Sequence, residues 1–251
     1  MKAIILAAGL TKSTDYHGFP LDYKPKCLLK YVEPPEREPD ARLEDWVYEP
    51  VPESTAPTIL ERDVKILRKH GVDEIIVIVG YKADEVMAHS KERNLGLKFV
   101  HNPGYAELYA GHVDSLIQGL SEIPPDDAFL LIMGDVIITD RLVENLLKCE
   151  KKIGIRKYFR REILAAKLSL QVISGISSVK GKGVLEFCDW LYKLGGGTWD
   201  SPGPGTEDID GRDGAWEVDS IIDLFSKHGW NTAPPQPILE QLRKRLKEQQ
   251  G

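Results

Sequence analysis

The sequence has little cysteine, no excess of positive charge and no long apolar run. Its cysteines, Cys27, Cys149 and Cys188, lie far apart, so reduced thiols in a cytoplasmic protein are the simplest account. No stretch approaches the ~20 apolar residues of a membrane-spanning helix. The apolar run that begins at Ala3 breaks at Gly9, so we expect no signal peptide. The net charge of -6 at pH 7 argues against a general affinity for nucleic acid.

Signatures of several common ligand sites are missing as well. The glycine pairs at 181–183 and 203–205 lack the third glycine and the strand-to-helix context of a dinucleotide site. No P-loop sequence occurs, and the histidines share no zinc-ligand spacing. The aspartate-rich stretch from 208 has Asp213 where a calcium-binding loop needs glycine. Any ligand site must therefore be assembled from other residues.

What the chain does have is a regular alternation of strand and helix patterns in its first half. With 42% hydrophobic residues, 251 residues suffice for one α/β domain with a sizeable core. Apolar runs predict strands at 2–8, 74–79, 97–100 and 128–133. A first helix is expected from Thr58, where a capping box opens it, to Gly71, which stops it. Further helices are expected after Gly80 through about Lys91, at 109–120 and at 141–149. This order predicts a Rossmann-like, doubly wound α/β fold with a mainly parallel sheet.

Three segments depart from this pattern. Residues 31–57 form an acidic, proline-rich insertion, and residues 195–214 are rich in glycine and aspartate, which is typical of a mobile loop. We therefore expect one domain over 1–232 that contains both segments. Residues 233–251 hold a charged amphipathic helix. That helix is a candidate for contacts between copies of the chain, so a homodimer is one expectation and the oligomeric state stays open.

Polar and small residues follow the predicted strands, where ligands of such sheets bind. Leu6-Ala7-Ala8-Gly9 ends the first strand, and its small residues let backbone N–H groups approach a phosphate or a base. The other interpretation is a strand that turns on glycine. Lys26, with further lysines nearby in the sequence, forms a local basic cluster that could neutralise phosphate oxygens. Solvated surface lysines are the alternative.

Two carboxylates are candidates for a metal site. Asp135 directly follows the apolar run 128–133, and Asp219 ends a short predicted strand that runs into a helix. Mg²⁺ is usually held by one or two carboxylates together with phosphates. The alternatives are a turn aspartate at 135 and a helix N-cap at 219.

Together these residues resemble the NTP-transferase family, of the nucleotide-diphospho-sugar transferase fold type. The likeness rests on Leu-Ala-Ala-Gly after the first strand, Pro25-Lys26, Gly134-Asp135 and the late Glu-Val-Asp at 217–219. The segments 173–176 and 216–219 make the chain most similar to phosphocholine-type cytidylyltransferases and to sugar-1-phosphate nucleotidyltransferases. The resemblance implies a nucleotidyltransferase that takes a nucleoside triphosphate, with CTP favoured, and a small phosphorylated acceptor, and releases pyrophosphate.

The resemblance also implies roles for individual residues. Leu6, Ala7, Ala8 and Gly9 would line the base and phosphates, with Gly80 and Gly111 near the base. Lys26 would meet the phosphates, and Asp135 and Asp219 would hold Mg²⁺. The sequence departs from the family after Gly9, where Lys12 stands for the usual arginine; Lys12 would lie near the departing pyrophosphate. Lysine keeps the charge and loses the bidentate fork.

The acceptor is less well defined. A choline-like phosphate needs an aromatic face and a carboxylate for its quaternary ammonium. Trp199 with Asp200 is one candidate pair and Trp190 with Tyr192 another, with Glu217 as a further substrate residue. Aromatic side chains that pack a loop onto the domain are the other interpretation, and sugar phosphates stay open as acceptors.

Two other classes of protein fit part of this pattern. A glycosyltransferase that uses a sugar nucleotide could share the fold, but the Asp-x-Asp motif usual after the middle strand is absent at 134–137. A non-catalytic, nucleotide-binding regulatory member of the same fold would explain the altered loop at 10–12. Retention of Asp135, Asp219 and Lys26 argues against that second class.

Overall fold

A computed structural model describes residues 1–9, 25–29, 57–105, 111–124, 127–158, 162–209 and 216–217. Its main feature is a seven-stranded sheet in the order β3-β2-β1-β4-β7-β6-β8. The strands are β1 (Lys2–Ala7), β2 (Glu74–Val79), β3 (Lys98–His101), β4 (Ala128–Met133), β6 (Ile153–Tyr158), β7 (Glu162–Ser169) and β8 (Thr206–Asp208). β3, β2, β1 and β4 are parallel, β7 is antiparallel to both of its neighbours, and β8 is parallel to β6. The predicted mainly parallel α/β sheet is confirmed.

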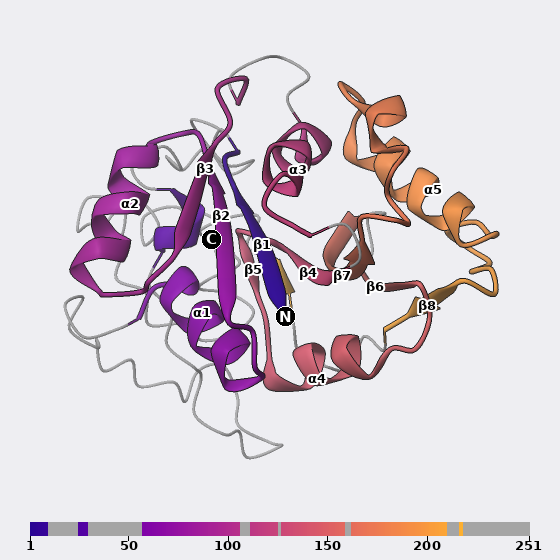
Figure 1. Ribbon diagram of the computed structural model, residues 1–251, viewed down its shortest axis with the longest axis horizontal. Helices are drawn as coiled ribbons and strands as arrows, with labels where there is room; N and C mark the ends of the chain where they lie inside the picture. The colour runs from indigo at the N-terminus through magenta and orange to yellow at the C-terminus, as the bar shows by residue number, and fades with distance from the viewer. Residues whose placement is uncertain are drawn as a thin grey trace, which may run out of the picture.

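Helices cover both faces of the sheet. α3 (His112–Leu120) and α5 (Val184–Leu194) lie on one side, and α1 (Ile59–Lys69) and α4 (Asp140–Lys148) on the other (Figure 1). α2 (Ala83–Glu92) is tied to the start of α1 by a hydrogen bond between Thr58 and His89. A separate two-stranded ladder pairs β5 (Val136–Ile137) with β9 (Trp216–Glu217). This ladder starts directly after Asp135, so it adjoins the end of β4.

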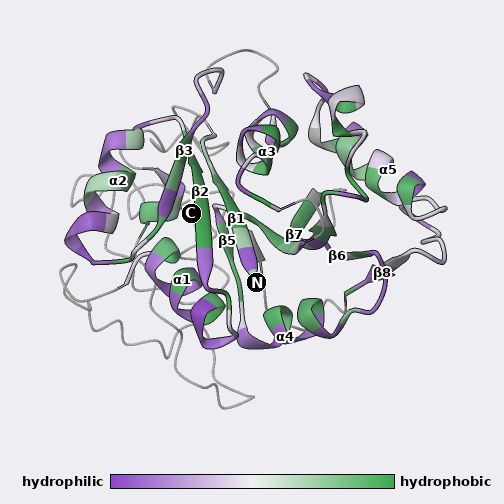
Figure 2. Cartoon of the chain, in the orientation of Figure 1, coloured by the Kyte–Doolittle hydropathy of each residue, from purple (hydrophilic) through white to green (hydrophobic). Residues whose placement is uncertain are grey.

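The apolar runs of the sequence form the core. The interior positions of β1, β2 and β4 are fully buried, as expected for parallel strands with both faces covered. Figure 2 shows these strands as the hydrophobic centre, while the helices carry their polar residues outward. Each β-branched or leucine side chain that is removed from water contributes roughly 1.5–3 kcal/mol.

The first helix follows its sequence signals closely. Thr58 caps α1, its side chain accepts a hydrogen bond from the Glu61 backbone N–H, and the Glu61 carboxylate accepts one from the Thr58 N–H. The helix ends before Gly71, which has a positive φ of 78°, a conformation that costs glycine little. The predicted capping box and stop are both confirmed.

The structure differs from the sequence-based expectations in the second half of the chain. The stretch from 195, predicted as a mobile loop, forms tight turns and then β8, with Gly205 N–H bonded to Gly195 O at 3.0 Å. A Cβ on Gly197 would lie 2.1 Å from the backbone N of Gly203, so these glycines allow close packing of backbone against backbone. Residues 31–56, 210–214 and 233–251 lie outside the described residues.

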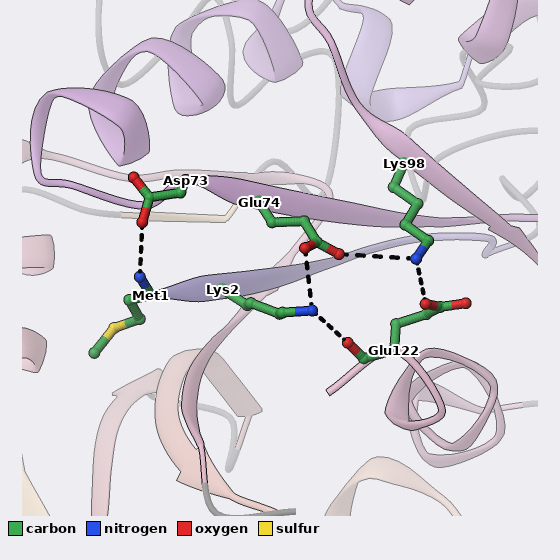
Figure 3. Close-up of polar contacts among 6 residues, drawn as sticks. All are labelled: Met1, Lys2, Asp73, Glu74, Lys98 and Glu122. Atoms are coloured by element: carbon green, nitrogen blue, oxygen red, sulfur yellow. Dashed lines mark hydrogen bonds and ion pairs between the residues drawn. The ribbon is translucent and has the colours of Figure 1, made fainter. Parts of the chain in front are cut away.

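The amino edge of the sheet carries paired charges instead of a site. Figure 3 shows two groups of contacts: the Met1 amino group pairs with Asp73, and a separate network joins Lys2, Glu74, Lys98 and Glu122. The Lys2 ammonium lies 3.1 Å from Glu74 and donates to the Glu122 carbonyl at 2.8 Å. Lys98 pairs with Glu122, and that hydrogen bond raises the pKa of Lys98. The charges at this edge neutralise one another.

Candidate active site

The carboxyl ends of β1, β2 and β4 meet at the opposite edge. The Gly134 N–H, just beyond β4, donates to the Leu6 carbonyl of β1 at 2.9 Å. The Tyr81 N–H, just beyond β2, donates to the Ala8 carbonyl at 3.2 Å. These bonds extend the sheet pairing by one residue at each strand end, so the small residues at 7–9, Gly80 and Gly134 form one continuous rim.

Two glycines of this rim are required by close backbone contact. A Cβ on Gly134 would lie 2.5 Å from the Leu6 carbonyl oxygen and 3.0 Å from the Ala7 Cα. A Cβ on Gly80 would lie 2.9 Å from the Ala8 carbonyl oxygen. Gly9 differs, because a Cβ there meets no atom of the described residues within 4 Å. Gly9 therefore faces space, where a ligand could approach its backbone.

Lys26 is delivered to this rim by a short, anchored turn. The 3-10 helix η1 (Lys26–Leu28) closes with a bond from Leu28 N–H to the Pro25 carbonyl at 2.9 Å. Cys27 and Leu28 are buried, and Ile59 N–H donates to the Leu29 carbonyl at 2.9 Å, which joins η1 to the start of α1. These contacts hold the backbone of Lys26 at the rim.

The Lys26 side chain reaches Asp135, just beyond the end of β4. The Lys26 Nζ lies 2.8 Å from the Asp135 Oδ2, and the two side chains are 25% and 23% exposed. Burial raises the pKa of Asp135, but the Lys26 ammonium, together with His112, outweighs it and holds that pKa below its usual range. Asp135 is therefore an ionised carboxylate at neutral pH, mostly shielded from solvent and paired with a cation that a phosphate could attract.

His112 and Cys27 complete the surroundings of Asp135. His112 is the first residue of α3, after the N-cap Gly111, and its charge acts on Asp135. No sequence signal marked His112, because a lone histidine at a helix start has no distinctive spacing. Burial raises the pKa of the Cys27 thiol to about 12, with a further contribution from Asp135. Cys27 is thus a neutral, packed thiol and no nucleophile.

The β5–β9 ladder brings the late segment of the chain to this place. Val136 pairs with Glu217 and Ile137 with Trp216 in antiparallel register. The residue next to Asp135 is therefore bonded to a residue two positions before Asp219. Asp219 and Lys12 lie outside the described residues, so their roles stay predictions.

A buried carboxylate supports the ladder from the α1 side. Asp63 of α1 is 2% exposed, and its Oδ1 accepts the Ile138 N–H at 3.3 Å. Burial raises the pKa of Asp63 well above its usual range, and the Arg62 guanidinium and the Ile138 N–H only partly offset this. Arg62 also donates to the Ile138 carbonyl. Both backbone groups of Ile138, three residues beyond Asp135, are thus held by α1.

The aromatic candidates for an acceptor site make contacts around β6 and α5. The Trp199 ring faces Lys157 of β6, and the Asp208 carboxylate pairs with the same ammonium. The pairing of Trp199 with Asp200 stays a prediction. Trp190 stacks on Phe187 at 6.2 Å between ring centroids, while Tyr192 is buried against Trp199. Residues two apart on a helix point to different sides, which is why Trp190 and Tyr192 form no common box.

Within the described residues, no group of three or more His, Cys, Asp and Glu side chains could hold a metal by itself. Asp135 fits a different kind of metal site, because Mg²⁺ is commonly held by one or two carboxylates and by substrate phosphates. Asp135 has the required chemistry: it is ionised, partly exposed and set at the rim beside Gly134.

Comparison with known proteins assigns the family. The MobA-like NTP transferase domain matches residues 3–161, so the chain belongs to that family. A bifunctional IPC transferase and DIPP synthase of Rubrobacter xylanophilus is 38% identical over 94 residues, which make up 37% of this chain and 20% of that protein. The chain thus spans about a fifth of the length of this curated relative.

Solved structures agree with the fold. The CTP:phosphocholine cytidylyltransferase of Streptococcus pneumoniae superposes with a TM-score of 0.53 at 20% identity, covering 88% of this chain and 95% of the other. The inositol-1-phosphate CTP transferase of T. maritima gives 0.57 at 16% identity, covering 90% and 92%. At these identities the likeness shows the nucleotidyltransferase type of Rossmann-like fold. Among the helices described, none has the length and apolar content to cross a bilayer.

Proposed function

We propose that this protein is a magnesium-dependent nucleotidyltransferase that joins a nucleoside monophosphate to a small phosphorylated acceptor and releases pyrophosphate. The observation that carries this proposal is the 2.8 Å pair of Lys26 and Asp135 at the carboxyl rim. A cation for phosphate and a carboxylate for a metal stand together there, beside the open backbone at Gly9. Membership of the MobA-like NTP transferase domain family supports the same reaction class.

The nucleotide belongs on the β1–β2 side of the rim. Ala7, Ala8 and Gly9 have small side chains or none there, next to Gly80, and Leu6 precedes them in β1. All four are the proposed residues around the base and phosphates. Gly111 stands at the start of α3, on the same edge. CTP is the favoured nucleotide, because two structures that share the fold are named as CTP-using transferases.

In the proposed reaction an oxygen of the acceptor phosphate attacks the α-phosphorus of the nucleotide. A new P–O bond forms, the bond to the β-phosphate breaks, and the electron pair leaves with pyrophosphate. Such transfers depend on positioning and on neutralisation of charge. Lys26 does both: Asp135 holds its ammonium in place before substrate binds, and the incoming phosphates then draw it toward the developing charge.

Asp135 and Asp219 would hold the Mg²⁺, and Lys12 would lie near the departing pyrophosphate. The bound ion would supply further neutralisation of charge on the phosphates. Asp135 enters this role already ionised, because Lys26 and His112 hold its pKa below the usual range against the effect of burial. Glu217, whose backbone pairs with Val136, stays a candidate substrate residue near the same rim.

The test is a screen for pyrophosphate release with CTP, UTP, GTP and ATP against phosphocholine, aminoethyl phosphonate, inositol 1-phosphate and sugar 1-phosphates. We expect Mg²⁺-dependent turnover with CTP and one acceptor class, and its loss in Asp135→Ala. Near-normal turnover in Asp135→Ala would refute the assigned site. Transfer of sugar from a nucleotide sugar, or nucleotide binding without turnover against every acceptor, would instead favour the glycosyltransferase or the regulatory protein.

A further inference from the structure

Outside the proposed site, the structure contains one cluster in which a cation is surrounded on several sides. Lys157 near the end of β6 places its Nζ 4.7 Å from the centroid of the Tyr192 ring and 4.9 Å from that of Trp199. The two rings stand at 68° to each other with centroids 5.5 Å apart. Both distances from the Lys157 Nζ to a ring centroid are inside the ~6 Å range in which a cation is attracted to an aromatic face.

Oxygen atoms complete the enclosure. The Lys157 Nζ lies 2.6 Å from the Asp208 Oδ2 and also donates to the Trp199 carbonyl. The Tyr192 hydroxyl donates to the Asp208 Oδ1 at 2.5 Å, so the carboxylate is held from its other side as well. Tyr192 is fully buried. We call these four residues, Lys157, Tyr192, Trp199 and Asp208, the cation box.

The cation box lies on the same edge of the sheet as Asp135. Ile132 of β4, Ala165 of β7 and Arg156 of β6 share one line of the sheet, so Lys157 and Met133 both stand one residue beyond it. β6 is two strands away from β4, which is a lateral separation on the order of 10 Å. The nucleotide is proposed for the β1–β2 side, so the β7–β6 side is the part of the rim left for the acceptor.

We propose that Lys157 is a built-in occupant of this box and thereby fixes the acceptor class: the site takes phosphates of neutral head groups, such as polyols and sugars, and rejects quaternary ammonium acceptors such as phosphocholine. Two aromatic faces, a carboxylate and a carbonyl are the groups that bind an organic cation. Here they are already engaged with an ammonium of the chain itself. This inference on acceptor class rests on the proposed function.

A binding experiment tests the box without any nucleotide or turnover. Lys157→Ala leaves Asp208 and both rings facing an empty space of the size of an ammonium group. We expect its Tm to fall, and methylammonium or tetramethylammonium chloride at tens of millimolar to restore a larger part of the loss than sodium chloride does. Tetramethylammonium should bind Lys157→Ala at least tenfold more tightly than the wild type, and Lys157→Ala/Trp199→Leu should lose this gain.

Lys167→Ala is the matched control. The Lys167 ammonium is also partly buried, but it donates to the backbone carbonyls of Leu147 and Cys149 at 3.2 and 2.7 Å. Organic cations should therefore restore Lys167→Ala no better than sodium does. Equal recovery of both variants, or none in Lys157→Ala, would overturn the cation box. If Lys157→Ala does not fold, Lys157→Met, which keeps an aliphatic stem for packing, serves in its place.

The acceptor class is tested by turnover. The wild type should prefer inositol 1-phosphate or a sugar 1-phosphate, and Lys157→Ala should gain at least tenfold in its kcat/KM for phosphocholine relative to that acceptor. Phosphocholine as the best acceptor of the wild type would overturn the inference and leave the nucleotidyltransferase intact. Absence of pyrophosphate release with every acceptor would sink the proposed function, and the cation-binding result would then stand by itself.

Discussion

The Lys26 ammonium and the Asp135 carboxylate, 109 residues apart in sequence, form a 2.8 Å ion pair at the carboxyl rim of the sheet. Each is fixed by a separate element: η1 holds Lys26, and the end of β4 holds Asp135. Both side chains keep about a quarter of their surface exposed. The pair is therefore rigid enough to be prearranged and open enough to be reached by a ligand.

We expect Lys26→Met to lower kcat on the order of 10²- to 10³-fold, the usual loss when a single group that stabilises transition-state charge is removed. The free energy of unfolding should also fall, by about 1–3 kcal/mol, because the mostly buried Asp135 carboxylate loses the ammonium that offsets its burial. Steady-state pyrophosphate release and urea denaturation measure the two effects. Asp135→Asn should show the same pattern, with an added rise in the Mg²⁺ concentration needed for half-maximal rate.

Lys2→Met is the matched control for these variants. Lys2 is similarly shielded, with 22% of its side chain exposed, and pairs with Glu74 at 3.1 Å, but it lies at the amino edge of the sheet (Figure 3). Its loss should affect stability alone. An equal loss of activity in Lys2→Met would mean that the effect of Lys26→Met comes from the fold.

Asp63 should make stability depend on pH. Burial raises its pKa, so the folded state holds the proton more tightly than the unfolded state. The contribution of Asp63 to the free energy of unfolding therefore falls as pH rises from the unfolded pKa of about 3.9, by up to about 1.4 kcal/mol per pH unit, until the folded pKa is passed. Asp63→Asn keeps an acceptor for the Ile138 N–H and stays neutral.

Urea denaturation of both proteins at pH 4, 6 and 8 checks this expectation. The advantage of Asp63→Asn over the wild type should grow from pH 4 upward. A difference that stays constant with pH, or that turns in favour of the wild type at pH 8, would contradict it. The difference between the free energies of unfolding of the two proteins cancels the contributions of all other titrating groups, because both proteins share them.

The first half of the fold could be predicted from local signals. The apolar run 128–133 became β4 with the same bounds, and the capping box at Thr58 and Glu61 set the start of α1. Other bounds shifted by a residue, as at β3 and α4. The hairpin of β6 and β7 was not predicted, because its strands carry lysine, arginine and glutamate among the apolar residues.

The site could be predicted only as far as its edge of the sheet. Strand ends place the residues at 6–9, Gly80 and Asp135 at one rim by topology, whereas contact between Lys26 and Asp135 depends on how η1 packs. The cation box could not be predicted from the sequence, since its four residues come from β6, α5, a turn and β8, spread between 157 and 208. The contact between Trp199 and Lys157, which lie 42 residues apart, depends on tertiary packing and has no signal in the sequence.

Thr58 should be worth more than an ordinary cap. Its hydroxyl accepts the Glu61 N–H at 3.1 Å and lies 3.2 Å from the His89 Nε2, which joins α1 to α2. Thr58→Ala should lower the free energy of unfolding by about 1–2 kcal/mol, the upper part of the range for a lost N-cap, because the contact with His89 is lost as well. Thr58→Ser keeps the hydroxyl and should lose less than half as much. Thermal and urea unfolding of both variants measure these losses. Equal losses in Thr58→Ala and Thr58→Ser would show that the threonine methyl group, which both variants lack at its native place, matters more than the hydroxyl.

The rim glycines should separate stability from binding. Gly134→Ala places a Cβ 2.5 Å from the Leu6 carbonyl oxygen and 3.0 Å from the Ala7 Cα, and backbone atoms on a paired strand can give way only by opening β1 from β4. Strain of this kind costs about 1–3 kcal/mol.

Gly9→Ala meets no described atom within 4 Å, so its free energy of unfolding should stay within about 0.5 kcal/mol of the wild type. In the proposed nucleotide site its methyl group would stand where the phosphates approach, and we expect a KM for CTP raised at least tenfold with kcat little changed. Calorimetry and steady-state kinetics on both variants check the pair: a Gly9→Ala protein that binds CTP normally would remove Gly9 from the nucleotide site, whatever Gly134→Ala does.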